Sequence, residues 1–551
     1  MRNALLTSLG FALLLLSTGC KDMLEEAPVG AFTPAFLSTP QGIEAGLTGV
    51  YSGNRDYYAN EEGMNLTVTG TDEFMMGGTV TALNQYNATL NSSTGAVSNR
   101  WTAFYTYINA ANGVIHYAST ASGIAPARAQ QVVAEAKLLR ANYYFLLVQF
   151  WGNVPLRLDF TETPDKTTYR ASIADVYSAI IKDLEDALAA LPTKLATDGR
   201  VTKPTALHLL AKVYLTRASS PARQSSDYAN AAKYAKMLLD NQATYGVALL
   251  SDVKQVFAEG NENSSEVLFN VQYLNNPQFN SQENGANFYF RMEYDKEPNM
   301  VRDQANGRPW FRFRPTSYLL DEVYQDRVND TRYNKWFTSV WYANSPGANG
   351  ATGAKRLPVG DTAVWMPGLM LPASVAASKR YKVILPSQYN YHEFPVLNKY
   401  DDTKRNAVND ASVRPFIVYR LAETYLIAAE ALLLDGKAND AVPYINAVRR
   451  RAAAAGKQTA MEVTASQLTL NFILNERARE LCGEQVRWLD LVRTNKLVER
   501  VKLQLQNPFG ADLSADAKMA GNSVQPYHQL RPIPQTEIDR STGYIPQNPG
   551  Y

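Results

Sequence analysis

The segment 416–454 constrains the fold most strongly, because it predicts two helices joined by a turn. Its sequence is FIVYRLAETYLIAAEALLLDGKANDAVPYINAVRRRAAA, and apolar side chains recur mainly at helical spacing from Ile417 to Leu432. Gly436 suits the left-handed backbone at the end of the first helix. Asp440 suits the N-cap of the second helix. A single helical hairpin cannot bury both of its faces, so the sequence predicts neighbours of the same kind.

Similar helix pairs recur elsewhere in the chain. Residues 211–215, AKVYL, resemble residues 422–426, AETYL, and both stretches fall in a first helix followed by an alanine-bearing second helix. Residues 127–191 and 202–241 predict two further pairs, and 466–499 at least one more long helix. Helix pairs of about 34 residues are typical of tetratricopeptide-like packing. The predicted fold class is therefore mainly α, with tetratricopeptide-like helical pairs as a scaffold, long irregular loops and a few short strands.

The N-terminus predicts export. Residues 1–19 read as a signal peptide, because the apolar run 4–16 follows Arg2 and is too short to span a bilayer as a helix. Small residues precede Cys20, as in a bacterial lipobox. Cys20 is therefore the expected lipidation site, and residues 20–40 the expected tether, which would hold the protein on a membrane through its N-terminal lipid. An ordinary secretory signal is the alternative.

Charge and cysteine content narrow the function classes. The lysine and acidic residues that follow Cys20 resemble the signal that sends lipoproteins to the cell surface in Bacteroidetes-type bacteria. Cys482 is the only other cysteine, so a lipidated Cys20 leaves no intramolecular disulfide. The formal charge is +2, from 54 basic and 52 acidic residues, which gives no field that favours nucleic acid. We expect no nucleic-acid partner.

Signals of catalysis are weak. The four histidines are scattered, without metal-ligand spacing, and no hydrolase or phosphate-binding motif is present. The sequence therefore predicts no catalytic residue, no metal site and no cofactor. A cluster of charged residues on the last helices is open to an acid/base interpretation, but an ion-pair network between packed helices is expected. The cluster comprises Glu423, Glu430, Glu476, Glu480 and Glu484 with Arg420, Arg449, Arg450, Arg477 and Arg479.

Three regions follow the tether. Residues 41–244 form an N-terminal helical region, in which 57–98 lack helical periodicity and predict loops. Residues 245–412 form a loop-rich variable region, with one strand predicted at 266–272 by alternation. The C-terminal region, at 413–551, begins with the helical hairpin. Long aromatic-rich loops inside a large fold are usually functional.

Several segments together carry a family resemblance. In chain order they are Cys20, Gly49-Val50-Tyr51, 138–156, 414–433, 445–453, 475–493, 530–538 (LRPIPQTEI) and 547–551 (QNPGY). Their order over nearly the full chain resembles the SusD/RagB family of outer-membrane nutrient-binding lipoproteins. The chain departs from the family pattern at Cys482-Gly483-Glu484, where the family commonly has an aromatic-glutamate-glycine order.

The resemblance implies a SusD-like α-α superhelix, a cell-surface position on the outer membrane and a partner. Family members sit on a SusC-like, TonB-dependent outer-membrane barrel and capture glycan fragments, or in some cases peptides, for import. The implied function is an oligosaccharide-binding protein without catalytic activity. Two alternatives remain open at this point: a surface glycoside hydrolase, and a helical scaffold that binds peptides or protein partners.

Candidate ligand-binding residues come from the two loop regions. The first loop region provides Asp72, Tyr86 and Trp101, although Trp101 begins a periodic helix and is also readable as a core residue. The second provides four aromatic residues, because rings stack on the apolar faces of sugars. They are Trp310, Trp341, Tyr342 and Trp365. Trp341 and Tyr342 predict an exposed platform, and Trp310 is also readable as structural.

Overall fold

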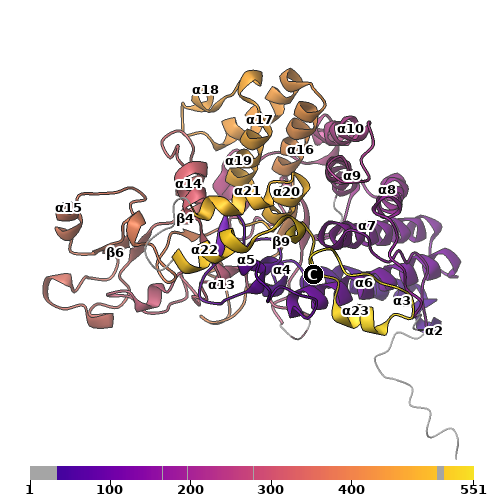
Figure 1. Cartoon of the computed structure of the whole chain (residues 1–551), viewed down its shortest axis with the longest axis horizontal. Helices are drawn as coiled ribbons and strands as arrows, with labels where there is room; N and C mark the ends of the chain where they lie inside the picture. Colours follow the sequence, from indigo (N-terminus) through magenta and orange to yellow (C-terminus); the bar gives the residue numbers. More distant parts are fainter. Residues whose placement is uncertain (1–33, 164–165, 195–196, 277, 279, 506–513) are drawn as a thin grey trace, which may run out of the picture.

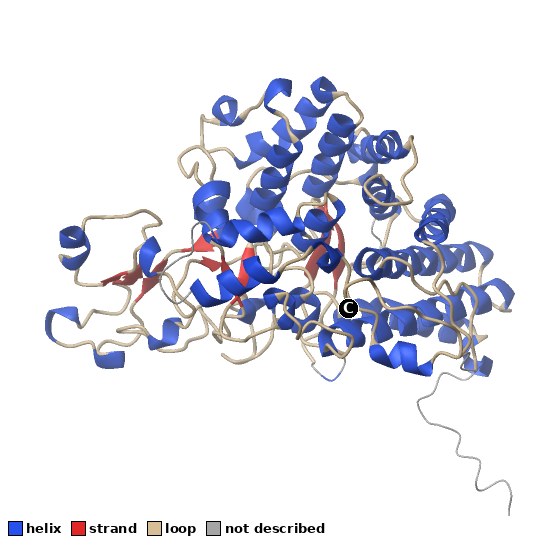
Figure 2. Ribbon diagram, in the orientation of Figure 1, coloured by secondary structure: helices blue, strands red, loops and turns tan. Residues whose placement is uncertain are grey.

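The computed structural model describes residues 34–163, 166–194, 197–276, 278, 280–505 and 514–551. The chain is mainly helical, with short strands near its centre and in a lobe at one end (Figures 1 and 2). The predicted signal peptide, Cys20 and most of the tether lie outside the described residues. No helix among those described is both long and apolar enough to cross a membrane.

Four helices build the N-terminal part of the scaffold. They are α3 (Pro40–Ser52), α6 (Gly95–Thr120), α7 (Pro126–Trp151) and α8 (Ile173–Ala190). Helix α7 packs against α6 on one side and α8 on the other. The Ser172 hydroxyl caps α8 by accepting a hydrogen bond from the backbone N–H of Asp175 at 3.1 Å.

The predicted helix pairs are confirmed. Helix α9 (Lys203–Arg217) packs against α10 (Asp227–Leu239), and α16 (Leu421–Leu434) packs against α17 (Ala438–Ala452). Helix α16 also contacts α9 and α10 across a sequence separation of about two hundred residues (Figure 1). The two similar hairpins therefore lie side by side and form one continuous wall.

The beginning of the 416–454 hairpin differs from the prediction. Phe416–Arg420 is strand β9 and not helix, and it pairs antiparallel with β2 (Val267–Val271), which confirms the predicted strand there. All residues of both strands are buried, and the sequence FIVYR of β9 shows no alternation of apolar and polar side chains. A short apolar run buried on both sides cannot be distinguished from a helix by periodicity. Ile417 accordingly lies in the sheet, opposite Asn270.

The prediction for the turn of the hairpin is confirmed at one residue and wrong at another. Gly436 has φ +77°, the left-handed conformation that its position predicts. Helix α17, however, begins at Ala438 with Lys437 as its N-cap. Asp440 is therefore the third helical residue and not the cap, because the helix starts closer to the glycine than the side-chain pattern indicates.

The region 245–412 holds short strands between its loops, and one of them pairs with a strand of the first loop region. β1 (Phe74–Met76) pairs with β3 (Phe313–Pro315), and β4 (Phe337–Thr338) pairs with β8 (Val396–Leu397), both antiparallel. A further sheet has the order β5-β6-β7 and forms the lobe on the left of Figure 1. Its strands are β5 (Val340–Tyr342), β6 (Thr362–Trp365) and β7 (Lys382–Val383).

The last part of the chain is broken into shorter helices than predicted. α19 (Leu470–Leu481) and α20 (Arg487–Arg493) are separated by a turn in which Gly483 has φ +74° and Gln485 has φ +59°. A Cβ at Gly483 would lie 2.5 Å from the Leu397 side chain, so the close approach requires glycine. The remaining helices are α2 (Pro34–Leu37), α4 (Glu61–Asn65), α5 (Ala82–Gln85), α11 (Gln242–Tyr245), α12 (Val253–Val256), α13 (Ala286–Tyr289), α14 (Arg332–Trp336), α15 (Ala373–Ala377), α18 (Gln458–Met461), α21 (Leu497–Lys502), α22 (Ser514–Ser523) and α23 (Gln535–Arg540).

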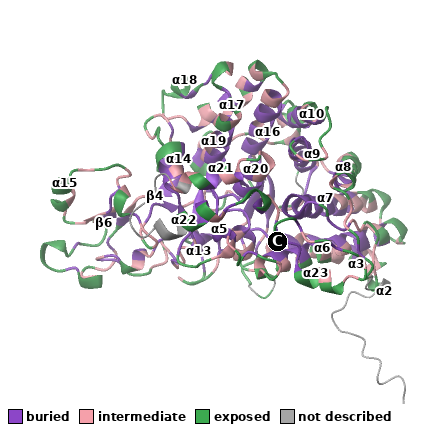
Figure 3. Cartoon of the chain, in the orientation of Figure 1, coloured by how far each residue is buried: buried purple, intermediate pink, exposed green. Residues whose placement is uncertain are grey.

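Buried ion pairs join the C-terminal helices to the central strands. Arg420, at the end of β9, contacts Glu484 at 2.7 Å, Glu480 at 2.6 Å and Glu266 at 3.0 Å. The clustered glutamates named above are all buried and ion-paired, mostly with buried arginines. The expected ion-pair network is thereby confirmed, with Arg450 as an exposed exception that pairs with Glu462. Figure 3 shows the same distinction between the buried helical interior and the exposed outer loops.

Candidate functional site

Two of the predicted ligand-binding residues are buried polar anchors. Asp72 is 1% exposed, and its carboxylate oxygens accept hydrogen bonds from Arg487 Nε at 2.7 Å and Nη2 at 2.6 Å. Tyr86 caps α5 in the left-handed conformation, and its hydroxyl donates to the Gly70 carbonyl at 2.6 Å. Burial raises the pKa of Tyr86 to about 12. Both side chains therefore hold the first loop region together instead of facing a ligand.

Two of the predicted tryptophans are also in the core. Trp101 packs edge-on against Trp151, with ring centroids 5.2 Å apart, and its Nε1 donates to Glu537 at 3.3 Å. Trp341 is 1% exposed and lies on the inner face of the lobe sheet. The predicted exposed platform at Trp341 and Tyr342 is thus half wrong, because successive residues of a strand point to opposite faces. Only Tyr342 faces solvent.

The other predicted residues remain accessible. Tyr342 is 59% exposed, and Trp365 and Trp310 are partly exposed. Tyr342 and Trp365 belong to the lobe sheet, whereas Trp310 lines the pocket described next. The structure therefore does not bring the predicted residues together into one site.

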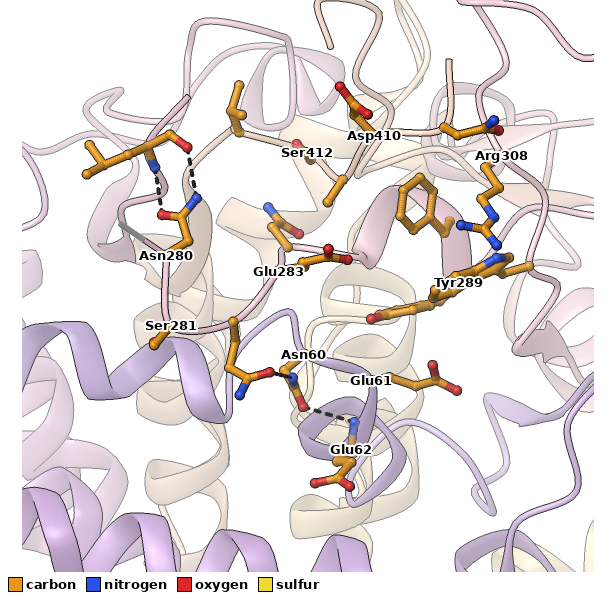
Figure 4. A pocket seen from close by; sticks show the side chains of 18 of the residues that line it. Asn60, Glu61, Glu62, Asn280, Ser281, Glu283, Tyr289, Arg308, Asp410 and Ser412 are labelled. Carbon is orange, nitrogen blue, oxygen red and sulfur yellow. Dashed lines mark hydrogen bonds between the residues drawn. The ribbon is translucent and has the colours of Figure 1, made fainter. Parts of the chain in front are cut away.

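An open pocket of about 840 Å³ lies where α4, the start of α6, the segment before α13 and two loops meet (Figure 4). We name it the Trp310 pocket. Its lining is rich in amide, carboxylate and aromatic side chains. It is formed by Asn60, Glu61, Glu62, Asn99, Arg100, Leu274, Asn275, Asn280, Ser281, Gln282, Glu283, Asn284, Phe288, Tyr289, Arg308, Trp310, Asn406, Asn409, Asp410, Ala411, Ser412 and Val413.

One wall of the pocket is aromatic. The rings of Trp310 and Tyr289 are stacked, with centroids 5.9 Å apart and planes at 24°, and Phe288 supports Trp310 at 5.1 Å. The guanidinium carbon of Arg308 lies 4.4 Å from the Trp310 ring centroid and that of Arg312 lies 5.0 Å from it. This packing fixes the indole in place, which gives the pocket a rigid flat surface.

The phenol of Tyr289 is held among acidic side chains. Figure 4 shows Tyr289 between Glu61 and Glu283, with Arg308 at the other end of the ring pair. Burial raises the pKa of Tyr289, and the neighbouring Glu61 and Glu283 carboxylates add to the effect. The hydroxyl therefore stays protonated and is able both to donate and to accept hydrogen bonds. A Cβ at Gly285 would lie 2.1 Å from this hydroxyl, so a glycine makes room for it.

The start of α4 supplies the polar floor. Asn60 caps α4, and its side-chain nitrogen donates to Gln282 Oε1 at 2.9 Å, which ties α4 to the segment before α13. Glu62 pairs with Arg100 at 3.1 Å, and Arg312 pairs with Glu61 at 2.7 Å. The polar groups of the floor are therefore oriented before any ligand arrives.

The opposite rim comes from the loop 406–413. The backbone N–H of Ser412 donates to the Asn284 carbonyl at 2.9 Å, and the Ser412 hydroxyl donates to Asp402 at 2.8 Å. Asn409 accepts a hydrogen bond from Arg302 Nη1 at 2.9 Å. Segments far apart in the sequence are thus fixed around one opening.

Backbone strain lies directly beside the aromatic wall. Phe311 has φ +38°, an unusual conformation for an aromatic residue. Its carbonyl accepts a hydrogen bond from the backbone N–H of Gly78 at 2.8 Å, and a Cβ at Gly77 would lie 1.8 Å from the same oxygen. The first loop region therefore holds Phe311, and with it Trp310, in position.

The pocket combines an aromatic wall with a polar lining. Glu61 and Glu62 are both committed to arginines, and no group of three or more His, Cys, Asp or Glu side chains within the described ranges is arranged to hold a metal ion. A flat aromatic wall with surrounding amide donors and acceptors suits a ligand that has apolar faces and many hydroxyl groups.

Sequence reasoning found Trp310 but missed the rest of the pocket. Tyr289 and Arg308 sit in stretches crowded with other aromatic and basic residues, and nothing in the sequence marks them out. The one available signal is the run of Asn and Gln residues between positions 275 and 287, together with Asn406 and Asn409. Amide-rich loops of this kind are typical of hydroxyl recognition, but sequence alone does not place them opposite Trp310.

Comparison with known proteins identifies the family. Residues 255–551 match the sequence profile of the SusD family, and residues 22–215 match a profile described as starch-binding associating with outer membrane. SusD-like protein P2 of Formosa agariphila is 27% identical, over 98% of this chain and 98% of its own length.

Solved structures share the fold. A SusD homologue from Bacteroides thetaiotaomicron superposes with a TM-score of 0.74 at 22% identity, over 94% of this chain and 98% of that one. Surface glycan-binding protein A from Bacteroides thetaiotaomicron, in complex with laminarihexaose, gives a TM-score of 0.68 at 22% identity, over 93% and 99% of the two chains. With one profile covering more than half of its residues, this chain belongs to the SusD family.

Proposed function

We propose that this protein binds oligosaccharides in the Trp310 pocket at the cell surface and delivers them to a SusC-like, TonB-dependent transporter in the outer membrane. The observation that carries the binding proposal is the pocket lining, in which a fixed Trp310–Tyr289 ring pair faces amide and carboxylate side chains. Membership of the SusD family supports the same class of ligand.

A pyranose ring presents two kinds of surface to a protein. Its C–H faces are apolar and stack on aromatic rings, whereas its rim of hydroxyls requires hydrogen-bond partners. The pocket volume of about 840 Å³ falls within the range of about 300–1,000 Å³ that is usual for small-ligand sites. The laminarihexaose complex of a structural neighbour puts β-glucans first among the ligands to test.

Binding without hydrolysis fits the pocket better than the alternative of a surface glycosidase. A glycosidase needs two carboxyl groups held across the scissile bond, one of them free to donate a proton. Of the four acidic side chains that line the pocket, Glu61 and Glu62 are neighbours in sequence and are each paired with an arginine, which leaves Glu283 and Asp410 as the pair that the product analysis below must exclude.

The proposed delivery step requires a membrane anchor and a transporter partner. Lipidation at Cys20 would hold the protein on the outer membrane, and the helical scaffold would contact the barrel. Replacing Cys20 by Ser is expected to release the protein from outer-membrane fractions, with a loss of co-purification of the transporter barrel. A fully membrane-bound variant would contradict the lipid anchor, and absence of the barrel from the unaltered protein's complexes would contradict the delivery step.

A glycan panel tests the binding proposal. The protein, produced without its N-terminal lipid, is run through native gels that contain laminarin, starch, xylan, mannan or pectin. Each mixture of protein and polysaccharide is then analysed for shorter products. We expect retardation by at least one polysaccharide with no product. Cleavage would support the glycosidase instead. Free migration in every gel, with capture of peptides from a digest, would support a peptide-binding scaffold.

A further inference from the structure

The lobe sheet has one face that the protein core covers. Trp341 on β5 pairs with Val364 on β6, and both side chains are almost completely buried. Lys382, opposite Val364 on β7, also points inward, because its amine contacts Glu297 at 2.9 Å. Cross-strand partners share a face, so the inner face of the sheet is defined by these three residues.

The outer face carries three aromatic rings. Trp365 pairs with Val340 and therefore lies on the same side as Tyr342, two residues further along β5. Tyr381, next to β7, contacts Trp365 with ring centroids 6.5 Å apart. Tyr342 is mostly exposed, and Trp365 and Tyr381 are partly exposed. We name Tyr342, Trp365 and Tyr381 the lobe platform.

The polar ends of these rings are unused. Among the described residues, no hydrogen bond reaches the Tyr342 hydroxyl, the Tyr381 hydroxyl or Trp365 Nε1. The strand side chains that share this face are Val340, Thr362 and Val383, and none of the three is charged. Exposed aromatic patches of this kind mark interaction sites. Rings with free polar ends beside uncharged strand residues match a ligand that alternates apolar faces with hydroxyls.

We propose that the lobe platform is a second carbohydrate-binding surface, which takes a further stretch of a neutral polysaccharide chain. Its class of ligand rests on the function proposed for the Trp310 pocket. Tyr342 and Trp365 lie on the same face of adjacent strands, with a β-bulge between the Trp341 and Tyr342 pairings, and Tyr381 contacts Trp365. Their rings therefore present a row along which an extended chain stacks.

Hydrogen bonds link the platform to the rim of the Trp310 pocket. Asn344, two residues after Tyr342, donates to the Val301 carbonyl at 2.8 Å. Arg302, which follows Val301 in the chain, donates a hydrogen bond to Asn409, and Asn409 lines the pocket. Two weak surfaces at a fixed separation bind a long chain more tightly than either binds alone. Polysaccharides should therefore gain from the platform, whereas short oligosaccharides that fill only the pocket should not.

The experiment compares Tyr342→Ala, the double variant Tyr342→Ala with Tyr381→Ala, and the control Tyr544→Ala, an exposed tyrosine elsewhere on the chain. Affinities are measured in native gels that contain the panel polysaccharides, and by calorimetry with their hexasaccharides. Melting temperatures check that each variant is folded, and light scattering checks its oligomeric state.

We expect the platform variants to bind the retained polysaccharide about tenfold more weakly, with hexasaccharide affinity within about twofold of the unaltered protein and no effect of Tyr544→Ala. Equal retention of all variants would overturn the platform while leaving the pocket intact. A change in oligomeric state caused by Tyr342→Ala would assign the surface to a second copy of the chain and would also overturn it. Free migration of the unaltered protein in every gel would contradict both the platform and the pocket.

Discussion

Asp72 and Arg487 illustrate, at the scale of single residues, how a buried ion pair decides what a polar side chain does. Both oxygens of the Asp72 carboxylate accept hydrogen bonds from one guanidinium, and neither side chain is appreciably exposed. Taking one partner away would leave an uncompensated buried charge. The pair therefore serves stability, in contrast to the partly exposed Trp310 of the pocket.

The first prediction concerns this pair. Asp72→Ala is expected to lower the free energy of unfolding by about 3–5 kcal/mol, because Arg487 loses its partner inside the protein. Asp361→Ala, at an exposed aspartate, is the matched control and is expected to change it by less than about 0.5 kcal/mol. Urea denaturation measures both values. A loss below about 1 kcal/mol for Asp72→Ala would show that the pair is not a structural anchor.

Glu73 is also buried, but unlike Asp72 it has a carboxyl oxygen without a hydrogen-bond partner in the part of the chain that the structure describes. Its Oε1 has no hydrogen-bond partner among the described residues, and Arg487 lies 3.7 Å away. Burial raises the pKa of Glu73 to about 8, and the attraction of Arg487 offsets only part of that effect. The carboxyl is therefore mostly neutral in the folded protein at pH 7.

The second prediction follows from this raised pKa. The unfolded value is 4.5, so the contribution of Glu73 to stability is complete below pH 4.5 and is lost progressively as the pH rises to about 8. Glu73→Gln, which cannot ionise, should gain stability relative to the unaltered protein as the pH rises from 5 to 9. Urea midpoints across this range test it. Parallel pH profiles for the two proteins would contradict the raised pKa.

At the scale of elements, the hairpin of α16 and α17 depends on one left-handed residue. Gly436 has φ +77°, and a Cβ there would meet no atom within 4 Å. Any cost of a side chain therefore comes from the backbone conformation alone and not from crowding. Gly95, the first residue of α6, has equally open surroundings without a positive φ.

The third prediction uses this difference. Gly436→Ala is expected to lower the free energy of unfolding by about 1–2 kcal/mol, because an L-residue resists the left-handed conformation. Gly95→Ala is expected to leave stability unchanged or to raise it slightly. Chemical denaturation of the two variants gives the comparison. Equal effects of the two substitutions would refute the conformational explanation.

Elements with strong periodicity and a defined cap could be predicted from the sequence. Ser172 marks the start of α8, and Gly436 marks the end of α16, because each residue has a local physical role. Phe416–Arg420 could not be assigned, since its partner β2 is about 150 residues away and burial on both faces removes the alternation. Helix α19 ends early because Gly483 must approach Leu397, which is again a distant contact.

At the scale of the whole molecule, the scaffold and the candidate site follow different rules. The helical wall of α9, α10, α16 and α17 is built from repeated local patterns, so one sequence is enough to predict it. The Trp310 pocket joins residues near 60, 100, 285, 310 and 410, and only the folded chain brings them together. Exposure is equally non-local: Trp341 and Tyr342 are adjacent in sequence but lie on opposite faces of the lobe sheet.

The central claim is that the Trp310 pocket binds oligosaccharides. The most direct test is a calorimetric titration of Trp310→Ala and Tyr544→Ala with the hexasaccharide of each polysaccharide in the panel, laminarihexaose first. We predict that Trp310→Ala, although less stable, is still folded at the assay temperature and binds at least about tenfold more weakly, because the aromatic wall is lost. The Tyr544→Ala control should match the unaltered protein. Affinity of Trp310→Ala within about twofold of the control would contradict the account.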